Sequence, residues 1–350
     1  MCRDRTPDPR QIQLHEQPRG TEEMQAEENA LKKCTQQAFD ADTQATSLHR
    51  WQQQYDQLGE GAFYGVTDLV EDQELQFFRE QIHQATQQEC QIWSEGLWIG
   101  FPALGQQCRI NGLEVENQLM LHAGTASFAL TTPNHFQIYG LVIQREALAT
   151  CAAQQHLPFS EQLWQAARRQ WSEQEQRLLQ SWIEHHLHGQ VSQPQLDRDQ
   201  LYSWLLLMLS DSEAQPSERP SYARRKATVD QVCELLRLHP ETPLSMSQLC
   251  ALTHTSRRTL QYSFETILGI SPLRYLRMTR LNQVRRRLVQ LAAAGEEVRI
   301  YQVAAEWGFW HPGQFALDYK TLFGESPSLT LAQHMQQAHH SGAAHHWDRA

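Results

Sequence analysis

The sequence predicts an α+β chain in which a β-rich N-terminal domain precedes a helical region and an all-α C-terminal domain. Three observations support this class. Apolar residues alternate with a period of two in much of residues 51–143, and they recur with a helical period over residues 145–213. Residues 249–272 are then repeated, with substitutions, by residues 303–327. A chain of 350 residues has room for about two such domains.

The domain boundaries follow from shifts in composition and period. We expect a disordered leader over 1–45, a β-rich domain over 46–145, a helical linker region over 146–213, a short linker over 214–221, an all-α domain over 222–335 and a disordered tail over 336–350. The leader is rich in Gln, Glu, Asp and Pro, so it cannot bury enough apolar surface to fold alone. The short linker is rich in Pro, Ser and charged residues.

Composition indicates a cytoplasmic protein. The first residues have no apolar core of the kind found in secretory signals. No apolar run approaches the roughly 20 residues that a membrane span needs. The seven cysteines are odd in number and scattered, so we interpret them as free thiols of a reducing compartment.

The β-rich domain contains short apolar runs that are separated by turn residues, at 63–70, 92–101, 118–121, 127–131 and 136–143. Short strands spaced this closely predict a sandwich or a barrel, and a small barrel can hold one ligand. Trp93, Trp98 and Tyr139 are candidates to line an effector pocket. The alternative is that they form plain core, which is the more common role of alternating aromatic residues on strands.

No sequence motif for catalysis or metal binding is present. Gly-rich phosphate loops, HExxH and GxSxG strings are absent. His83, His122 and His135 stand alone in the sequence, without the close His pair and following carboxylate of a metal site. We therefore expect neither enzyme activity nor a bound metal.

The internal repeat predicts two copies of a short helix, a turn and a longer helix. In the longer helix of each copy, apolar residues recur at i, i+4, i+7 and i+8, starting from Leu260 in the first copy and from Phe315 in the second. Both copies end in Gly-x-Ser-Pro, at Gly269 and Gly324. Such a Gly can close a helix in the left-handed conformation, while Ser caps the next helix and Pro suits its first turn.

The segment between the two copies predicts one stiff central helix over residues 272–290, with apolar side chains inside and arginines around it, namely Arg274, Arg277, Arg280, Arg285, Arg286 and Arg287. Its length would be roughly 28 Å at about 1.5 Å per residue. One turn of B-DNA is about 34 Å. A rigid connector of this size can place two recognition helices in successive major grooves.

The net charge of −10 is unevenly distributed. Residues 221–335 contain 14 Lys or Arg and 9 Asp or Glu, so this part is basic and the remainder is strongly acidic. A basic module on an acidic body is expected when only one domain contacts phosphates.

Residues 227–335 resemble the DNA-binding domain of the AraC/XylS family of transcription regulators, through the strings SRRTLQ, ILGISP, WGF and LFGESP on two units that share a helix. The resemblance implies a cupin-like sensor domain for a small-molecule effector, a possible homodimer through the helical linker region, and a role as an activator. It also implies promoter DNA and RNA polymerase as partners. Within the family, SRRTLQ, LNQVRRRL and WGFWHPGQFALDY are most similar to the branch that controls ethanolamine utilisation. That branch implies ethanolamine and adenosylcobalamin as effectors.

The resemblance also assigns DNA contacts to individual residues. A recognition helix reads base edges with its N-terminal residues. In the first copy these are Arg257, Arg258, Thr259, Gln261 and Tyr262, and in the second they are Trp310, His311, Gly313 and Gln314, with Lys320 as a phosphate contact. Because the second set has fewer polar groups, we predict that the first copy carries most of the sequence readout.

Two alternatives remain open. A regulator of the same class for another amine or amino-acid pathway fits the same residues. Some proteins join an AraC-type domain to an alkyl-accepting cysteine domain that repairs DNA. That chemistry needs clustered cysteines to activate a thiolate, whereas Cys34, Cys90 and Cys108 are widely spaced in the sequence.

Overall fold

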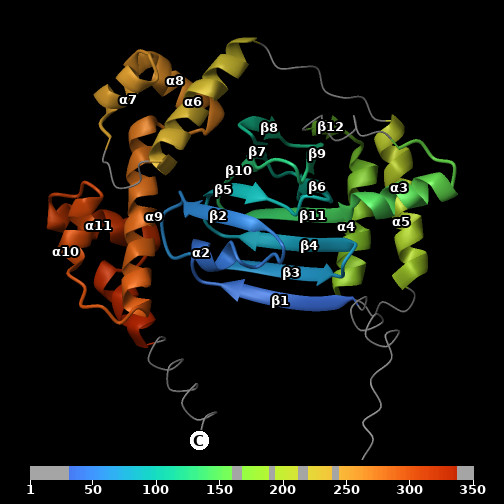
Figure 1. Ribbon diagram of the computed structural model, residues 1–350, viewed down its shortest axis with the longest axis horizontal. Coiled ribbons are helices and arrows are strands. Elements are labelled where there is room, and N and C mark those ends of the chain that lie inside the picture. Colours follow the sequence, from blue (N-terminus) through green and yellow to red (C-terminus); the bar gives the residue numbers. More distant parts are fainter. Residues whose placement is uncertain (1–30, 160–167, 189–193, 212–219, 239–243, 337–350) are drawn as a thin grey trace, which may run out of the picture.

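The computed structural model describes residues 31–159, 168–188, 194–211, 220–238 and 244–336. Figure 1 shows a central β domain, a group of helices against one side of it, and a helical C-terminal domain against the other. The α+β class predicted from the sequence is confirmed. Nearly all of the predicted linker over 214–221 and tail over 336–350 lies outside the described residues.

The β domain consists of two antiparallel sheets. The seven-stranded sheet has the order β1-β3-β4-β11-β6-β9-β12, and the five-stranded sheet has the order β2-β5-β10-β7-β8. The strands are β1 (Lys32–Ala38), β2 (Gln52–Gln57), β3 (Gly65–Glu71), β4 (Leu75–Ile82), β5 (Thr86–Gln91), β6 (Gly96–Pro102), β7 (Cys108–Ile110), β8 (Leu113–Val115), β9 (Gln118–Ala123), β10 (Phe128–Thr132), β11 (Phe136–Gln144) and β12 (Arg168–Gln170).

The predicted leader over 1–45 is wrong for its last part, because residues 32–38 form β1 and residues 41–44 form the helix α2 (Ala41–Gln44). β1 pairs with β3 along its whole length, at the edge of the seven-stranded sheet. Most of its side chains are exposed, so the strand depends on backbone pairing and on contacts such as Thr35 Oγ1 to Asp68 Oδ1 at 2.7 Å. A polar edge strand has no apolar pattern that would distinguish it from a leader.

The seven-stranded sheet is buried on both faces. One face packs against the five-stranded sheet around Trp98 and Phe128, which are both buried. The other face carries Phe101 and Tyr139 and is covered by helices. Because successive side chains of a strand point to opposite faces, each long strand contributes to both cores.

Three helices cover that second face, namely α3 (Arg145–Gln154), α4 (Glu173–His188) and α5 (Pro194–Asp211), as Figure 1 shows. They match the helical region predicted over 146–213, except that residues 168–170 form the additional strand β12 next to β9. Within the described ranges, no helix combines the length and apolarity that crossing a bilayer requires.

The C-terminal domain contains the duplicated helices that the repeat predicts. Unit one consists of α7 (Met246–Leu252) and α8 (Arg257–Ile267), and unit two consists of α10 (Ile300–Glu306) and α11 (Pro312–Phe323). The central helix α9 (Pro272–Ala293) joins them, and α6 (Pro220–Leu238) packs against α8. Unit one lies beside the upper end of α9 and unit two beside its lower part (Figure 1).

The two helix stops behave as the Gly-x-Ser-Pro motif predicts. Gly269 and Gly324 both have φ of +74°, in the left-handed region where other residues are strained. Ser271 then caps α9 by accepting a hydrogen bond from the backbone N–H of Arg274 at 3.3 Å. In the second copy, Ser326 Oγ accepts from the backbone N–H of Leu329 at 3.2 Å.

Candidate nucleic-acid interface

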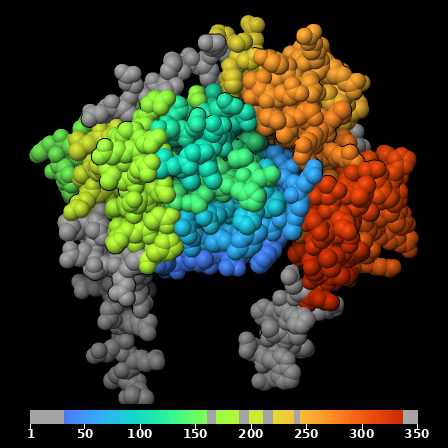
Figure 2. Space-filling view, turned by 180° about the vertical axis from the view of Figure 1, so that it is seen from behind, coloured from blue at the N-terminus to red at the C-terminus, as the bar shows by residue number. Residues whose placement is uncertain are grey.

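The N-terminal half of α8 presents polar residues to solvent. Ser256 caps the helix by accepting from the backbone N–H of Thr259 at 3.1 Å. Leu260 and Phe264 are fully buried under α6 and α9, which turns the opposite face outward. That face exposes Arg257, Arg258, Thr259 and Tyr262, with Gln261 half-buried beside them. Figure 2 shows units one and two as two lobes on one side of the β domain.

Not every predicted contact residue of α8 is equally available. Thr259 Oγ1 lies 2.8 Å from Ser256 Oγ, so its hydroxyl belongs to the helix cap. Gln261 Nε2 donates to Glu265 Oε1 at 2.6 Å. The Tyr262 ring is 58% exposed, and the Arg225 guanidinium of α6 lies 5.1 Å from its centroid. The most accessible hydrogen-bond donors of this face are therefore the two arginines.

The longer helix of unit two, α11, and the residues just before it present a mainly apolar face. Trp310 is 71% exposed and Leu317 is 59% exposed, so both offer surface to a partner. His311 occupies the N-cap position without a side-chain cap hydrogen bond, and Pro312 begins the helix. Exposed Ala316 and Leu317 are suited to apolar contact with thymine methyl groups.

The polar residues of α11 are constrained by neighbours. Gln314 Nε2 donates to Asp318 Oδ1 at 2.8 Å, and Asp318 also pairs with Arg277 of the central helix. Gly313 has an open surface around it, and Lys320 is exposed in the last turn. In both α8 and α11, therefore, a glutamine amide donates a hydrogen bond to an acidic residue one turn later, Gln261 to Glu265 and Gln314 to Asp318.

Most arginines of the central helix bind other parts of the protein. Arg274 lies 3.4 Å from Glu60, Arg277 pairs with Asp318, Arg280 donates to the Leu244 carbonyl at 2.6 Å, Arg285 pairs with Glu325, and Arg286 pairs with Asp42 and Asp56. Arg287 is exposed. The arginines predicted around this helix are therefore largely engaged in ion pairs and hydrogen bonds within the protein.

The three candidate effector residues do not share one pocket. Trp98 is 1% exposed and stacks on Phe128 at 4.5 Å between the two sheets. Tyr139 points to the opposite face of the seven-stranded sheet, where its hydroxyl donates to Glu184 at 2.6 Å. Trp93 lies under the Arg50 guanidinium at 3.9 Å. Strand alternation separates Trp98 from Tyr139, and the expectation of a common pocket is corrected accordingly.

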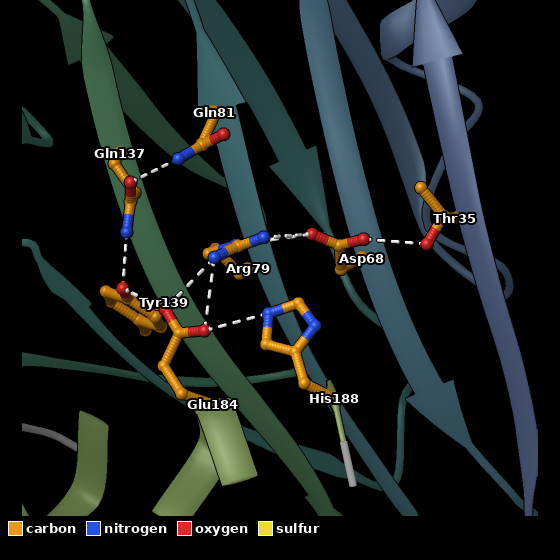
Figure 3. A network of polar contacts seen from close by, with 8 residues as sticks. All are labelled: Thr35, Asp68, Arg79, Gln81, Gln137, Tyr139, Glu184 and His188. Atoms are coloured by element: carbon orange, nitrogen blue, oxygen red, sulfur yellow. Dashed lines mark hydrogen bonds and ion pairs between the residues drawn. The ribbon is translucent and has the colours of Figure 1, made fainter. Parts of the chain in front are cut away.

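Tyr139 belongs to a polar network that fastens α4 to the sheet (Figure 3). Arg79 binds Asp68 at 2.6 Å and Glu184 at 3.1 Å, and His188 lies 3.1 Å from the same Glu184 carboxylate. Burial opposes ionisation of Asp68, but hydrogen bonds from Thr35 and Arg79 lower its pKa below the ordinary value. These contacts connect the sheet to the last turn of a helix whose other side includes exposed Leu178.

A buried carboxylate inside the β domain escaped the sequence analysis. Glu80 is 3% exposed and accepts hydrogen bonds from Gln44 Nε2 at 2.8 Å and from the Tyr55 hydroxyl at 3.2 Å. Desolvation by burial raises its pKa to about 7, although both hydrogen bonds act in the opposite direction. Glu80 alternates along β4 with the core residues Phe78 and Ile82, and an acid at such a position is the signal that could have indicated it.

Comparison with known proteins places the C-terminal domain in context. A helix-turn-helix domain family matches residues 249–333. The “Probable thc operon regulatory protein” of Rhodococcus erythropolis is 38% identical over 98 residues, which are 28% of this chain and 29% of that protein. The “XylDLEGF operon transcriptional activator 2” of Pseudomonas putida is 32% identical over 117 residues, which are 33% of this chain and 73% of that protein.

Among solved structures, a chain described as a probable AraC family transcriptional regulator from Rhodopseudomonas palustris is 31% identical. The match covers 32% of this chain and 97% of that chain, with a TM-score of 0.28. This chain spans well under half the length of the thc operon regulatory protein, so that protein is matched only in part.

Proposed function

Because the chain belongs to the AraC/XylS family of transcriptional regulators, we propose that it binds double-stranded promoter DNA sequence-specifically and activates a catabolic operon. The observation that carries this proposal is the exposure of Arg257 and Arg258 at the N-terminus of α8, on a unit that recurs at α11. Arginine pairs with guanine in a bidentate manner in the major groove.

The central helix supports two-groove binding. α9 has 22 residues, which at about 1.5 Å per residue make it about 33 Å long. This length is close to one turn of B-DNA, about 34 Å. We propose that α8 and α11 enter successive major grooves, with Arg257, Arg258, Gln261 and Tyr262 as base or phosphate contacts in the first and Trp310, His311, Gly313 and Gln314 in the second. Lys320 would contact a phosphate.

The effector assignment follows from the sequence resemblance. We propose ethanolamine utilisation as the controlled pathway, with ethanolamine and adenosylcobalamin as effectors of the β domain. A regulator of the same class for another amine or amino-acid pathway is the alternative, and the XylDLEGF activator shows that a relative of the C-terminal domain serves a different operon. RNA polymerase as a partner, a homodimer through α4 and α5, and a cytoplasmic location complete the proposal.

The alkyl-transfer alternative gains no support from the cysteines. Cys34 lies exposed on an edge strand, while Cys90 and Cys108 are buried on β5 and β7. Burial raises the pKa of the Cys108 thiol to about 12 and also raises that of Cys90. A nucleophilic cysteine needs the opposite shift.

The decisive experiment is selection from a randomised duplex library with the full chain, followed by sequencing of the bound DNA. We expect wild type to enrich a defined motif, and the double variant Arg257→Ala with Arg258→Ala to lose that enrichment. Arg177→Ala is the control, because it removes an exposed arginine that lies on α4, outside the C-terminal domain, and pairs with Glu173 of the same helix. Equal enrichment by the double variant and wild type, or no motif with wild type, would contradict sequence-specific binding through α8.

The effector is tested separately by thermal unfolding of the full chain with ethanolamine, cobalamins and other amines. A rise in the melting temperature with ethanolamine but not with size-matched alcohols supports the ethanolamine pathway. A rise with a different amine alone supports the alternative pathway instead.

A further inference from the structure

The two repeat-equivalent glycines lie where the β domain touches the C-terminal domain. A side chain at Gly324 would begin 2.5 Å from the backbone nitrogen of Ala62, in the loop after β2. A side chain at Gly269 would begin 2.9 Å from Arg109 Nη1, on β7. The stop of each recognition helix is thus a point of close approach for a different loop or strand of the β domain.

The contact at unit two is made by hydrogen bonds to the end of α11. Gln57 Nε2 donates to the Leu322 carbonyl at 2.6 Å. The backbone N–H of Gly61 lies 3.0 Å from the Thr321 carbonyl and 3.1 Å from that of Leu322. These carbonyls belong to the last turn of a helix, where they lack partners within the helix itself.

The contact at the central helix uses the free edge of β2, the outermost strand of the five-stranded sheet. The Asn282 side chain accepts from the backbone N–H of Gln57 and donates to its carbonyl, both at 3.0 Å. Arg286 binds Asp42 at 2.6 Å, Asp56 at 2.7 Å and the Tyr55 carbonyl at 2.6 Å. Buried charges are retained only with such complete pairing.

The contact at unit one is made by the hairpin between β7 and β8. Asn111 and Gly112 both have positive φ, as the tight turn of a two-residue hairpin requires. A side chain at Gly112 would begin 2.5 Å from Ile267 Cγ2 in the last turn of α8 and 3.0 Å from the Tyr222 hydroxyl oxygen. The hairpin tip therefore touches the C-terminal end of α8.

Through these contacts the β domain holds both recognition helices, α8 and α11, at their C-terminal ends. The N-terminal residues that would enter the grooves, such as Arg258 and Gln314, are exposed. The β domain therefore does not cover the reading residues, so burying them is not how it would act on DNA binding. It can act by fixing how far apart, and at what relative angle, the two helices are held.

We propose that the β domain is a brace that sets the separation of the two recognition helices, with Gln57 and Arg286 as positioning residues. A change in the β domain is then read out as a changed preference for the spacing between two half-sites, each being the base pairs contacted by one unit. This inference rests on the proposed function, because it presupposes that both units bind DNA.

The test is the same library selection, with a randomised core of about 30 base pairs that covers about three turns of about 10.5 base pairs. The variants are Gln57→Ala on the β domain and Arg286→Ala on the central helix. Gln54→Ala is the control, because the side chain of this exposed glutamine of β2 forms no hydrogen bond or ion pair with the C-terminal domain among the described residues. Circular dichroism confirms that each variant is folded.

We expect wild type and Gln54→Ala to enrich two half-sites at one spacing. A change of that spacing by one base pair should weaken binding about tenfold, which is the scale of one mismatched base pair. Gln57→Ala and Arg286→Ala should enrich the same half-sites at several spacings. For these variants, the affinities at two spacings that differ by one base pair should differ by only about two- to threefold. Unchanged spacing in both folded variants, or a uniform loss at every spacing, overturns the brace. Enrichment of a single half-site by wild type also overturns it, whereas no enriched motif contradicts the proposed function itself.

Discussion

Replacing Arg258 by alanine should weaken specific DNA binding far more than replacing Gln314 by alanine. Arg258 is exposed at the start of α8, and within the described ranges no carboxylate is paired with it, so it can bind a guanine without first breaking an ion pair. A bidentate arginine–guanine contact discriminates by about 1–3 kcal/mol, which corresponds to about a 5- to 150-fold rise in Kd.

Unlike Arg258, Gln314 is already hydrogen-bonded within the protein before DNA binds. Its amide already donates to Asp318 at 2.8 Å, and this bond must be exchanged for one to a base. The net gain of such an exchange is about 1 kcal/mol or less, so we expect about a two- to fivefold rise in Kd for Gln314→Ala. Asp318 keeps its pairing with Arg277 in that variant, which limits secondary effects.

Fluorescence anisotropy at constant salt, with a labelled duplex recovered by the wild-type selection, measures both Kd values. Arg177→Ala on α4 serves as the control for loss of one exposed positive charge. Equal losses for Arg258→Ala and Gln314→Ala would refute the asymmetry between the two units. A larger loss of affinity for Gln314→Ala would mean that unit two, rather than unit one, carries most of the sequence readout.

Three further predictions concern stability and electrostatics. Burial raises the pKa of Glu80 from 4.5 to about 7, so between these pH values the folded chain keeps a proton that the unfolded chain has released. The free energy of unfolding should therefore fall by up to about 3 kcal/mol as pH rises through this window. The melting temperature of Glu80→Gln should vary less with pH than that of wild type. If both proteins show the same slope of melting temperature against pH, the effect belongs to other groups. Gly324→Ala should lower the melting temperature, because the left-handed backbone alone disfavours alanine by about 1–2 kcal/mol and the new methyl group would meet Ala62; an unaltered melting temperature would show that the loop moves freely. Lys320→Ala should weaken binding equally for all sequences and reduce the slope of log K against log salt by about one, whereas an unchanged slope would exclude a phosphate contact.

The C-terminal domain was largely predictable because its information is local. The spacing of Leu260, Phe264 and their repeat partners sets the buried face, and the Gly-x-Ser-Pro strings set the helix ends. The exposed positions of Arg257 and Arg258 follow directly from that face. What the sequence could not provide is the side-chain pairing on the surface, such as Gln314 with Asp318, since several rotamers satisfy the same helix.

The β domain was predictable only in outline. Strands with long apolar runs, such as the one predicted over 136–143, were recognised, whereas polar β1 and β2 were not. Trp98 and Tyr139 were grouped because both are aromatic, yet the assignment of a side chain to one face depends on register with distant strands. Asn282 and Arg286 were visible in the sequence as polar residues on the central helix, but their partners lie more than 200 residues away.

The internal pairing of the α9 arginines has a consequence for how this protein would search a genome. Arg277, Arg285 and Arg286 are each paired with a carboxylate of the same molecule, so these three attract random duplex less strongly than unpaired arginines would. Residence on unrelated sequence should then be brief, because counterion release supplies most of that affinity. Rapid dissociation from non-specific DNA leaves more protein molecules free to bind elsewhere. It also shortens the distance over which each molecule slides along the duplex.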